Sequence, residues 1–279
     1  MSFAYATTNL CSGLAAAAFT WSSGTAGATR SRLNDTKMSA LYVNGASVAS
    51  GINVVIDFGS AVALTGFAIC NSNAAVQKTN ATLKVESADD AGISVNNVVR
   101  KAASTLNSAL FYNKDHVVQF STGTARRYWR LTWTWTGNVA DFAIGEIFAF
   151  NAQTVLSRKS IYGDGEAPEF KTASVEFYSG GGCAYFQGGP IRLKNLPFSD
   201  LSTSDRDELL TMWAATKGPA TPFLFIPSYE ATATAAAVAE QEVVFGQLMV
   251  DKFSWTQPDF NLFDPTQLVI RSLGREIGA

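Results

Sequence analysis

Short apolar segments separated by turn residues dominate the first half of the chain and predict β-strands. Segments 52–58 and 64–70 are largely apolar and end at a glycine and an asparagine, respectively. Segment 81–87 alternates apolar and polar residues, so that Lys84 and Glu86 lie on a solvated face of the predicted strand. Strands of this length at short intervals favour an antiparallel sandwich.

The clearest alternation lies in RRYWRLTWTW, residues 126–135. One face of this predicted strand carries Trp129, Leu131, Trp133 and Trp135, and the other carries Tyr128, Arg130, Thr132 and Thr134. We expect the two mid-strand tryptophans, Trp129 and Trp133, to belong to the core. Trp135 stands beside the turn sequence TGN, where its ring could form an exposed stacking platform for a sugar.

The second half contains further predicted strands and one short helix near residues 204–217. Ser202 or Ser204 is expected to cap the first turn, and Gly218 to end the helix. The acidic residues that suit the positive end of the helix dipole are Asp205, Asp207 and Glu208. The apolar face is expected to consist of Leu209, Leu210, Met212 and Trp213.

The segment after the helix, residues 223–226, is apolar on both faces of a predicted strand and is bracketed by Pro222 and Pro227. Pro222 is expected to start the strand, and Pro227 to end it or mark an edge. A strand that is apolar on both faces needs cover on both sides. The helix is one expected cover, and the rest of the sandwich or a neighbouring subunit is the other. The candidate subunit contacts are Pro227, Ser228, Tyr229 and Glu230.

The chain of 279 residues is long enough for two medium domains. The pattern changes near residue 152, which predicts one domain at 1–152 and another at 153–279. We therefore predict an all-β fold with one short α-helix, in which each domain is a β-sandwich.

Charge is low: 16% of the residues are charged and the formal net charge is −2. This balance gives no long-range attraction to nucleic acid or to an anionic membrane. No segment approaches the roughly 20 apolar residues of a membrane helix. We expect no nucleic-acid partner and no membrane insertion. The low charge also suggests an assembly, which would cover more surface than one fold can.

Residues suited to enzyme or metal chemistry are sparse. Three cysteines, Cys11, Cys70 and Cys183, lie far apart and predict buried free thiols. His116 is the single histidine and is expected at the surface or at a strand edge. A single histidine and widely spaced cysteines disfavour a zinc site. The turn-like pair at residues 89–90 is expected to be solvated, and a weak calcium site there stays open. We predict no catalytic residue, no metal and no cofactor, and a protein that is not an enzyme.

Two stretches of the first half resemble discoidin-type, galactose-binding-like domains. They are NVVIDFGSAVALTGFAICNSN and ARRYWRLTWTWTGNVADFAIGEIFAF, which cover most of residues 51–150. The resemblance implies that the N-terminal domain is a jelly roll. Loops at one end of a sandwich are the usual binding surface, and amides recognise sugar hydroxyls. The candidate glycan-binding residues are Trp135, Asn138, Asn71, Asn73 and Gln77.

Four stretches of the second half resemble small β-sandwich tail proteins of long-tailed bacteriophages, among them distal tail proteins and lambda-type minor tail proteins. They are YGDG at 162–165, ELLTMWAATKG at 208–218, PFLFIPSYE at 222–230 and VVFGQLMVDKFSW at 243–255. The resemblance implies a protein that acts through structure, by forming a ring at the end of the tail.

These patterns together predict a structural virion protein of a tailed phage, made in the host cytoplasm and located in the tail. The C-terminal domain would join a tail-tip or baseplate ring, as a homo-oligomer that is either a trimer or a hexamer, beside other tail proteins of the tube, hub or fibre. The jelly roll would project outward for decoration or for attachment to a host surface glycan. The alternative is a stand-alone, lectin-like carbohydrate-binding module.

Overall fold

The computed structural model forms two compact units. One comprises Met1–Ser157 with Phe223–Val244, and the other comprises Arg158–Pro222 with Phe245–Ala279. The structure describes residues 2–22, 33–34, 42–43, 47–106, 115–139, 142–156, 165–177, 182–196, 198, 201–229, 244–250, 252, 254–259, 262–265 and 268–272. The first unit thus ends beyond the predicted boundary at residue 152 and takes in a later segment, whereas the prediction had a single cut.

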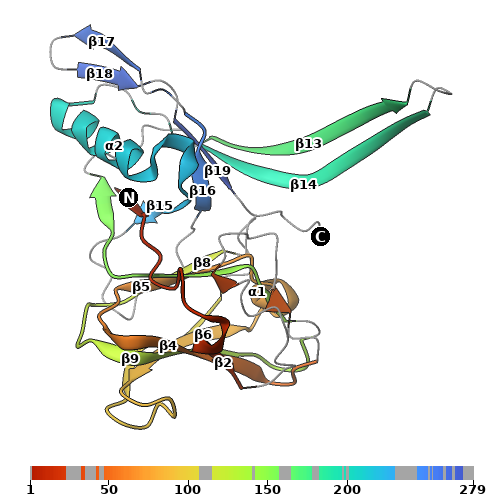
Figure 1. The fold of residues 1–279 in the computed structure, drawn as a ribbon, viewed down its shortest axis with the longest axis vertical. Helices are drawn as coiled ribbons and strands as arrows, with labels where there is room; N and C mark the ends of the chain where they lie inside the picture. The colour runs from red at the N-terminus through yellow and green to blue at the C-terminus, as the bar shows by residue number, and fades with distance from the viewer. Residues whose placement is uncertain are drawn as a thin grey trace. The chain divides into compact units, whose positions relative to one another are not determined.

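The first unit contains two antiparallel sheets that lie face to face (Figure 1). The five-stranded sheet, in spatial order, is β2 (Phe19–Trp21), β4 (Gly51–Val62), β9 (Arg126–Thr134), β6 (Thr82–Ala88) and β7 (Val98–Thr105). The three-stranded sheet is β11 (Glu146–Phe150), β5 (Gly66–Cys70) and β8 (His116–Gln119). The smaller elements are η1 (Ala16–Ala18), α1 (Ala74–Gln77) and the pair of β10 (Ala143–Ile144) with β3 (Tyr42–Val43).

One hydrophobic core fills the space between the two sheets. The five-stranded sheet contributes Ile52, Val54, Ile56, Leu83, Val85, Trp129, Leu131 and Trp133. The three-stranded sheet contributes Phe67, Ile69, Val118, Ile147 and Ala149. The rings of Phe67 and Trp129 meet across the sandwich, with centroids 5.8 Å apart. The predicted all-β fold is therefore confirmed, as is the core position of both mid-strand tryptophans.

The outer face of the five-stranded sheet is polar but not fully solvated. Glu86 on β6 was expected to face water, yet it is buried, because Lys84 and Arg130 approach it from either side. Its carboxylate lies 2.9 Å from Lys84 Nζ and 2.7 Å from an Arg130 terminal nitrogen. Burial by itself raises the pKa of Glu86, but the hydrogen bonds from these two residues outweigh burial and hold the pKa below its usual value.

A further sheet of the first unit contains β12 (Thr154–Leu156), β1 (Ser2–Ala6) and β15 (Phe223–Tyr229). The pairing of β15 with β1 explains why this late segment belongs to the first unit. All four side chains from Phe223 to Ile226 are buried, as their two-sided apolar pattern predicts. Pro227 does not end the strand. Instead, the register with β1 shifts between Ile226 and Tyr229, and a shift of this kind tolerates the missing N–H of a proline.

The second unit contains the predicted helix, α2 (Thr203–Thr216). Ser202 caps it, since its hydroxyl accepts from the Asp205 N–H at 3.2 Å while the Asp205 carboxylate accepts from the Ser202 N–H at 3.0 Å. The helix ends where Lys217 and Gly218 both adopt left-handed backbone conformations. The buried residues are Asp205, Leu209, Met212 and Thr216, so Leu210 and Trp213 of the predicted apolar face are only half-buried.

The second unit also contains a sheet and a hairpin. The sheet consists of β16 (Val244–Leu248, its first residue being grouped with the first unit), β19 (Leu268–Ser272), β14 (Gly182–Leu196) and β13 (Gly165–Phe177). The hairpin is β17 (Trp255–Asp259) with β18 (Leu262–Pro265), and η3 (Gly218–Ala220) follows α2. Within this unit β13 and β14 form a long hairpin (Figure 1). Over the described residues, no helix is long and apolar enough to cross a membrane.

Gly66 on the central strand β5 lies close to residues of both neighbouring strands, β8 and β11. A Cβ at this position would lie 2.8 Å from the Val118 carbonyl oxygen and would overlap the Phe150 ring. We expect Gly66→Ala to lower the free energy of unfolding by about 1–3 kcal/mol, measured by urea unfolding followed by tryptophan fluorescence. In Ala102→Ser, where the side chain is exposed, a change within about 0.5 kcal/mol is expected. Equal losses in both variants would contradict this packing argument.

Candidate ligand-binding loop end

Several loops meet at one end of the jelly roll. β9 ends at Thr134, which is paired with Gly51 of β4 and Thr82 of β6. In the other sheet β5 ends at Cys70, which is paired with Glu146 of β11. The polypeptide that follows β5 and β9 therefore turns at this end. We call residues 71–81, 135–139 and 142–145 the polar loop end.

Direct contacts hold these loops together. The Thr136 N–H donates to the Asn80 side-chain oxygen at 3.5 Å. Lys78 reaches the neighbouring turn, since a Cβ at Gly137 would lie 3.3 Å from its ammonium nitrogen. At the base of the same turn, Val139 is bridged to Val48 by two backbone hydrogen bonds of 2.9 Å. These contacts join Lys78 and Asn80, which directly follow NSNAAVQ, to the TGN turn. The expectation that NSNAAVQ itself reaches the same rim stays a prediction.

Two of the predicted ligand residues, Asn71 and Asn73, shape the loops. Asn71 adopts a left-handed conformation with φ of 54°, and its N–H donates to Asp115 Oδ1 at 2.6 Å. The Asn73 side-chain oxygen accepts from the Ala143 N–H at 2.9 Å, and its own N–H donates to the Ala143 carbonyl at 3.2 Å. Asn71 is buried and Asn73 is half-buried. The Asn73 bonds fix the turn after β5 against the strand β10, and the Asn71 bond fixes it to the residue before β8.

Trp135 is not an exposed stacking platform, and that expectation is wrong. Its side chain is 6% exposed, its indole N–H donates to the Val48 carbonyl at 3.1 Å, and its ring stacks on Phe142 with centroids 5.6 Å apart. The apolar alternation of β9 continues one residue past the strand, so the ring enters the core beneath the loops. Trp135 therefore forms the rigid base of the polar loop end.

The remaining predicted residues, Gln77 and Asn138, are exposed on the polar loop end. Three further polar residues on this end were not expected from the sequence: exposed Asn80 and Thr136, and half-buried Lys78. Their signal was weak, because KTN is an ordinary turn sequence directly before a strand. Only the contact between the two loops brings it to the same rim as TGN.

A buried polar layer lies at the same end of the sandwich. His116 begins the edge strand β8, which agrees with the strand-edge expectation, but it is fully buried and so does not lie at the surface. Glu146 is also buried and accepts a hydrogen bond from Asn9 Nδ2 at 3.0 Å. In the part of the chain that the structure describes, no group of three or more His, Cys, Asp and Glu side chains is arranged to hold a metal ion.

The thiols of Cys11 and Cys70 are free and buried, as predicted. Burial raises the pKa of Cys70 well above its usual value, and the charges of Asp115 and Glu146 raise it further. Burial and Glu146 raise the pKa of Cys11 in the same direction. Both thiols therefore stay protonated and unreactive at neutral pH. The third cysteine, Cys183, lies in β14.

The state of these thiols can be measured directly. In a Cys183→Ser variant we expect Cys11 and Cys70 to resist dithiobis(nitrobenzoic acid) at pH 8 and to react only after unfolding in guanidinium chloride. A cysteine introduced at exposed Ser121 supplies the positive control. Rapid reaction of either native thiol in the folded protein would contradict its burial.

No protein-family model matches the chain, and no curated protein matches it. Solved structures similar to it include carbohydrate-binding modules. The chitosan-binding module 1 of a chitosanase/glucanase from Paenibacillus sp. IK-5 is 18% identical, and the match covers 51% of this chain and 98% of that chain with a TM-score of 0.39. CpGH89CBM32-5 from Clostridium perfringens, solved with GalNAc-beta-1,3-galactose, is 11% identical, with coverage of 47% and 93% and a TM-score of 0.37. CBM62 from Clostridium thermocellum Xyl5A is 20% identical, with coverage of 48% and 94% and a TM-score of 0.35.

Proposed function

We propose that the polar loop end binds a carbohydrate. The observation that carries this proposal is the set of exposed polar side chains that two loops bring to one rim: Gln77, Asn80, Thr136 and Asn138. Amide and hydroxyl groups both donate and accept hydrogen bonds, which suits the hydroxyl groups of a sugar. Loops on a rigid sandwich are also a common place for ligand recognition.

The mode of binding follows from what lies beneath the rim. Trp135 is buried, so its face is not offered to a sugar ring, and hydrogen bonds supply the recognition. The indole and Phe142 make the base rigid, while the Asn73 bonds and the valine bridge anchor the loops. A preformed rim loses less conformational freedom on binding than a flexible one. Lys78 adds an ammonium donor at the same place.

The proposal predicts that the exposed amides carry affinity. A glycan array of the full chain identifies a ligand, and calorimetry then measures its affinity for Gln77→Ala/Asn138→Ala. Loss of two hydrogen bonds worth about 0.5–1.5 kcal/mol each lowers the affinity by about fivefold to about 150-fold. Asn97→Ala, which removes an exposed amide at the opposite end of the sandwich, is the matched control and keeps full affinity. A wild-type chain that binds no glycan, or a double variant with unchanged affinity, rejects the proposal.

We further propose that the chain is a homo-oligomeric structural protein. The supporting observation is the hairpin of β13 and β14. β14 pairs with β19 only from Leu193 to Leu196, whereas its pairing with β13 continues to Gly182. Among the described strands, none pairs with the edge of β13 that faces away from β14. None pairs with the edge of β14 that faces away from β13 before Leu193. Unpaired strand edges are templates for strands of another chain.

This assembly proposal includes the finer role expected from the sequence: a virion protein in the tail tip or baseplate ring of a tailed phage, as a trimer or a hexamer, beside other tail proteins. The jelly roll would then present its carbohydrate site to a host surface. Of the candidate subunit contacts, Pro227, Ser228 and Tyr229 lie in β15, where Tyr229 is paired with Ser2. Glu230 lies outside the described residues. Their role in a subunit contact stays a prediction.

Shortening the hairpin tests the assembly proposal. Thr172 is paired with Gln187, so replacing residues 173–186 by Asn-Gly closes a shorter hairpin in the same register. We expect the wild-type chain to have an oligomeric mass in light scattering and the shortened chain to have a monomeric one. The Gln77→Ala/Asn138→Ala variant, which leaves the hairpin intact, stays oligomeric. A monomeric wild-type chain, or a shortened chain that forms the same oligomer as the wild type, would refute this role for the hairpin.

A further inference from the structure

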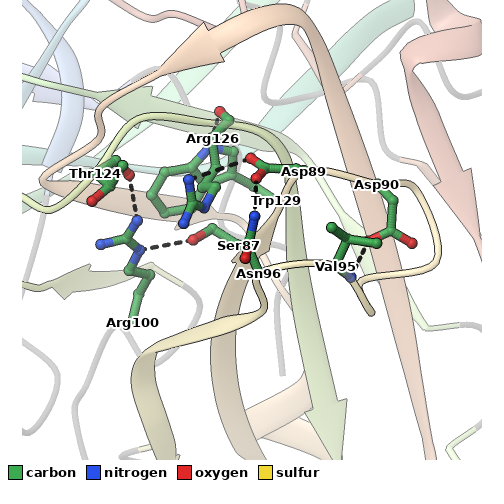
Figure 2. Close-up of polar contacts among 9 residues, drawn as sticks. All are labelled: Ser87, Asp89, Asp90, Val95, Asn96, Arg100, Thr124, Arg126 and Trp129. Carbon is green, nitrogen blue, oxygen red and sulfur yellow. Dashed lines mark hydrogen bonds and ion pairs between the residues drawn. The ribbon is translucent and has the colours of Figure 1, made fainter.

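A second cluster of polar residues lies at the opposite end of the jelly roll, where β6 ends and β9 begins. Ala88 is paired with Tyr128 near the start of β9, and the turn 89–97 connects β6 to β7. Figure 2 shows that residues of this turn, of β6, β7 and β9 and of the segment before β9 converge here. Two of them are the arginines Arg100 and Arg126.

Arg100 bonds only to neutral groups among the described residues. Its Nε donates to Ser87 Oγ at 2.8 Å, and a terminal nitrogen donates to the Thr124 carbonyl. The guanidinium carbon lies 5.3 Å from the centroid of the Trp129 ring (Figure 2). A hydroxyl, a carbonyl and an indole face orient the guanidinium, and none of the described residues supplies a counter-ion to its charge.

Arg126 adds a second positive charge beside it. One terminal nitrogen lies 3.4 Å from Asp89 Oδ1, a long ion pair, and its buried Nε has no hydrogen-bond partner in the described structure. The two guanidinium groups interact unfavourably: burial lowers the pKa of Arg100, and the charge of Arg126 lowers it further. A guanidinium stays protonated despite such shifts, so the pair keeps both charges.

The two carboxylates of the turn do not neutralise this pair. Asp89 accepts from Asn96 Nδ2 at 2.8 Å in addition to its ion pair. Asp90 accepts from the N–H groups of Ser94 at 2.8 Å and Val95 at 2.6 Å, and these bonds close its own turn. Figure 2 shows the Asp90 carboxylate directed at Val95, on the side of the turn away from both arginines. Two guanidinium groups therefore face one carboxylate.

Gly123, in the segment before β9, leaves room for the Arg100 side chain. A Cβ at Gly123 would overlap a terminal nitrogen of Arg100, so only a glycine lets the guanidinium lie against this backbone. The preceding residues Ser121 and Thr122 are exposed and add two hydroxyl groups nearby in sequence. Arg100 and Arg126 are themselves half-buried, so solvent and small solutes can reach them.

We propose that Arg100 and Arg126 form a binding site for an oxyanion, the carboxylate or sulfate group of a small ligand. Planar guanidinium groups match such groups through paired, charge-assisted hydrogen bonds. One bound anion would supply a counter-ion to Arg100 and offset the repulsion between the two guanidinium groups. This site lies at the other end of the jelly roll from the carbohydrate site and does not depend on it.

The experiment titrates the full chain with sodium sulfate, sodium galacturonate, neutral galactose and sodium chloride at matched ionic strength, with amide NMR shifts as the readout. Sulfate and galacturonate are expected to shift signals of residues 87–100 and 121–127, whereas galactose and chloride leave them in place. Saturation by only one of the two anions identifies its group as the ligand chemistry. No saturable shift with either anion overturns the proposal.

Charge-matched variants separate a site from general attraction. Arg126→Gln and Arg100→Gln are each expected to weaken anion binding by at least about tenfold, because each removes one fork of the pair. The control is Arg127→Gln. It removes one positive charge from the residue next to Arg126, and that charge is paired with Asp57 on an exposed surface. If Arg100→Gln loosens the loop, Arg126→Gln alone decides. Unchanged binding in Arg126→Gln, or an equal loss in Arg127→Gln, rejects the site. Loss of glycan binding at the polar loop end would leave this result unaffected.

Discussion

Aromatic packing along the inner face of β9 is the interaction on which the jelly roll depends. Trp129 meets Phe67 of the opposite sheet and stacks on Phe120, with centroids 5.7 Å apart. Four residues on, Trp133 contacts Trp21 and Phe142. Buried aromatic rings contribute large apolar areas, and offset or edge contacts add to that stabilisation. Trp129 thereby joins the two sheets, and Trp133 joins β9 to β2 and to the segment before β10.

The same strand supports both candidate binding ends. At its start, Trp129 lies beneath Arg100 and provides the indole face that orients the guanidinium. Just past its end, Trp135 stacks on Phe142 beneath the polar loop end. The two ends nevertheless differ in chemistry: one offers exposed amides and a hydroxyl, and the other offers two cations. A rigid core with different loops at each end allows one fold to carry two independent sites.

The proposed carbohydrate and assembly roles place different demands on the chain and are compatible. Carbohydrate binding needs only the loops of the first unit and a core that keeps them in place. Assembly draws on the unpaired strand edges of the β13–β14 hairpin in the second unit. The pairing of β15 with β1 also makes the first unit depend on chain from the far end of the sequence. Each role therefore has its own structural basis.

Local pattern determined the all-β class, the buried face of β9 and the helix near residues 204–217, because each depends on local spacing and on side chains a few residues apart. It left Ser202 and Ser204 both open as the helix cap, and the structure identifies Ser202. Tertiary structure decided the rest. Trp135 looked exposed beside a turn, but its ring fits the core and its N–H meets Val48, far away in the sequence. Glu86 was expected to be solvated from its place in the pattern, but Lys84 of its own strand and Arg130 of the neighbouring strand form ion pairs with it. Neither the rim shared by Asn80 and Asn138 nor the arginine pair has a sequence signature, since both arise where loops separated in the chain meet in space.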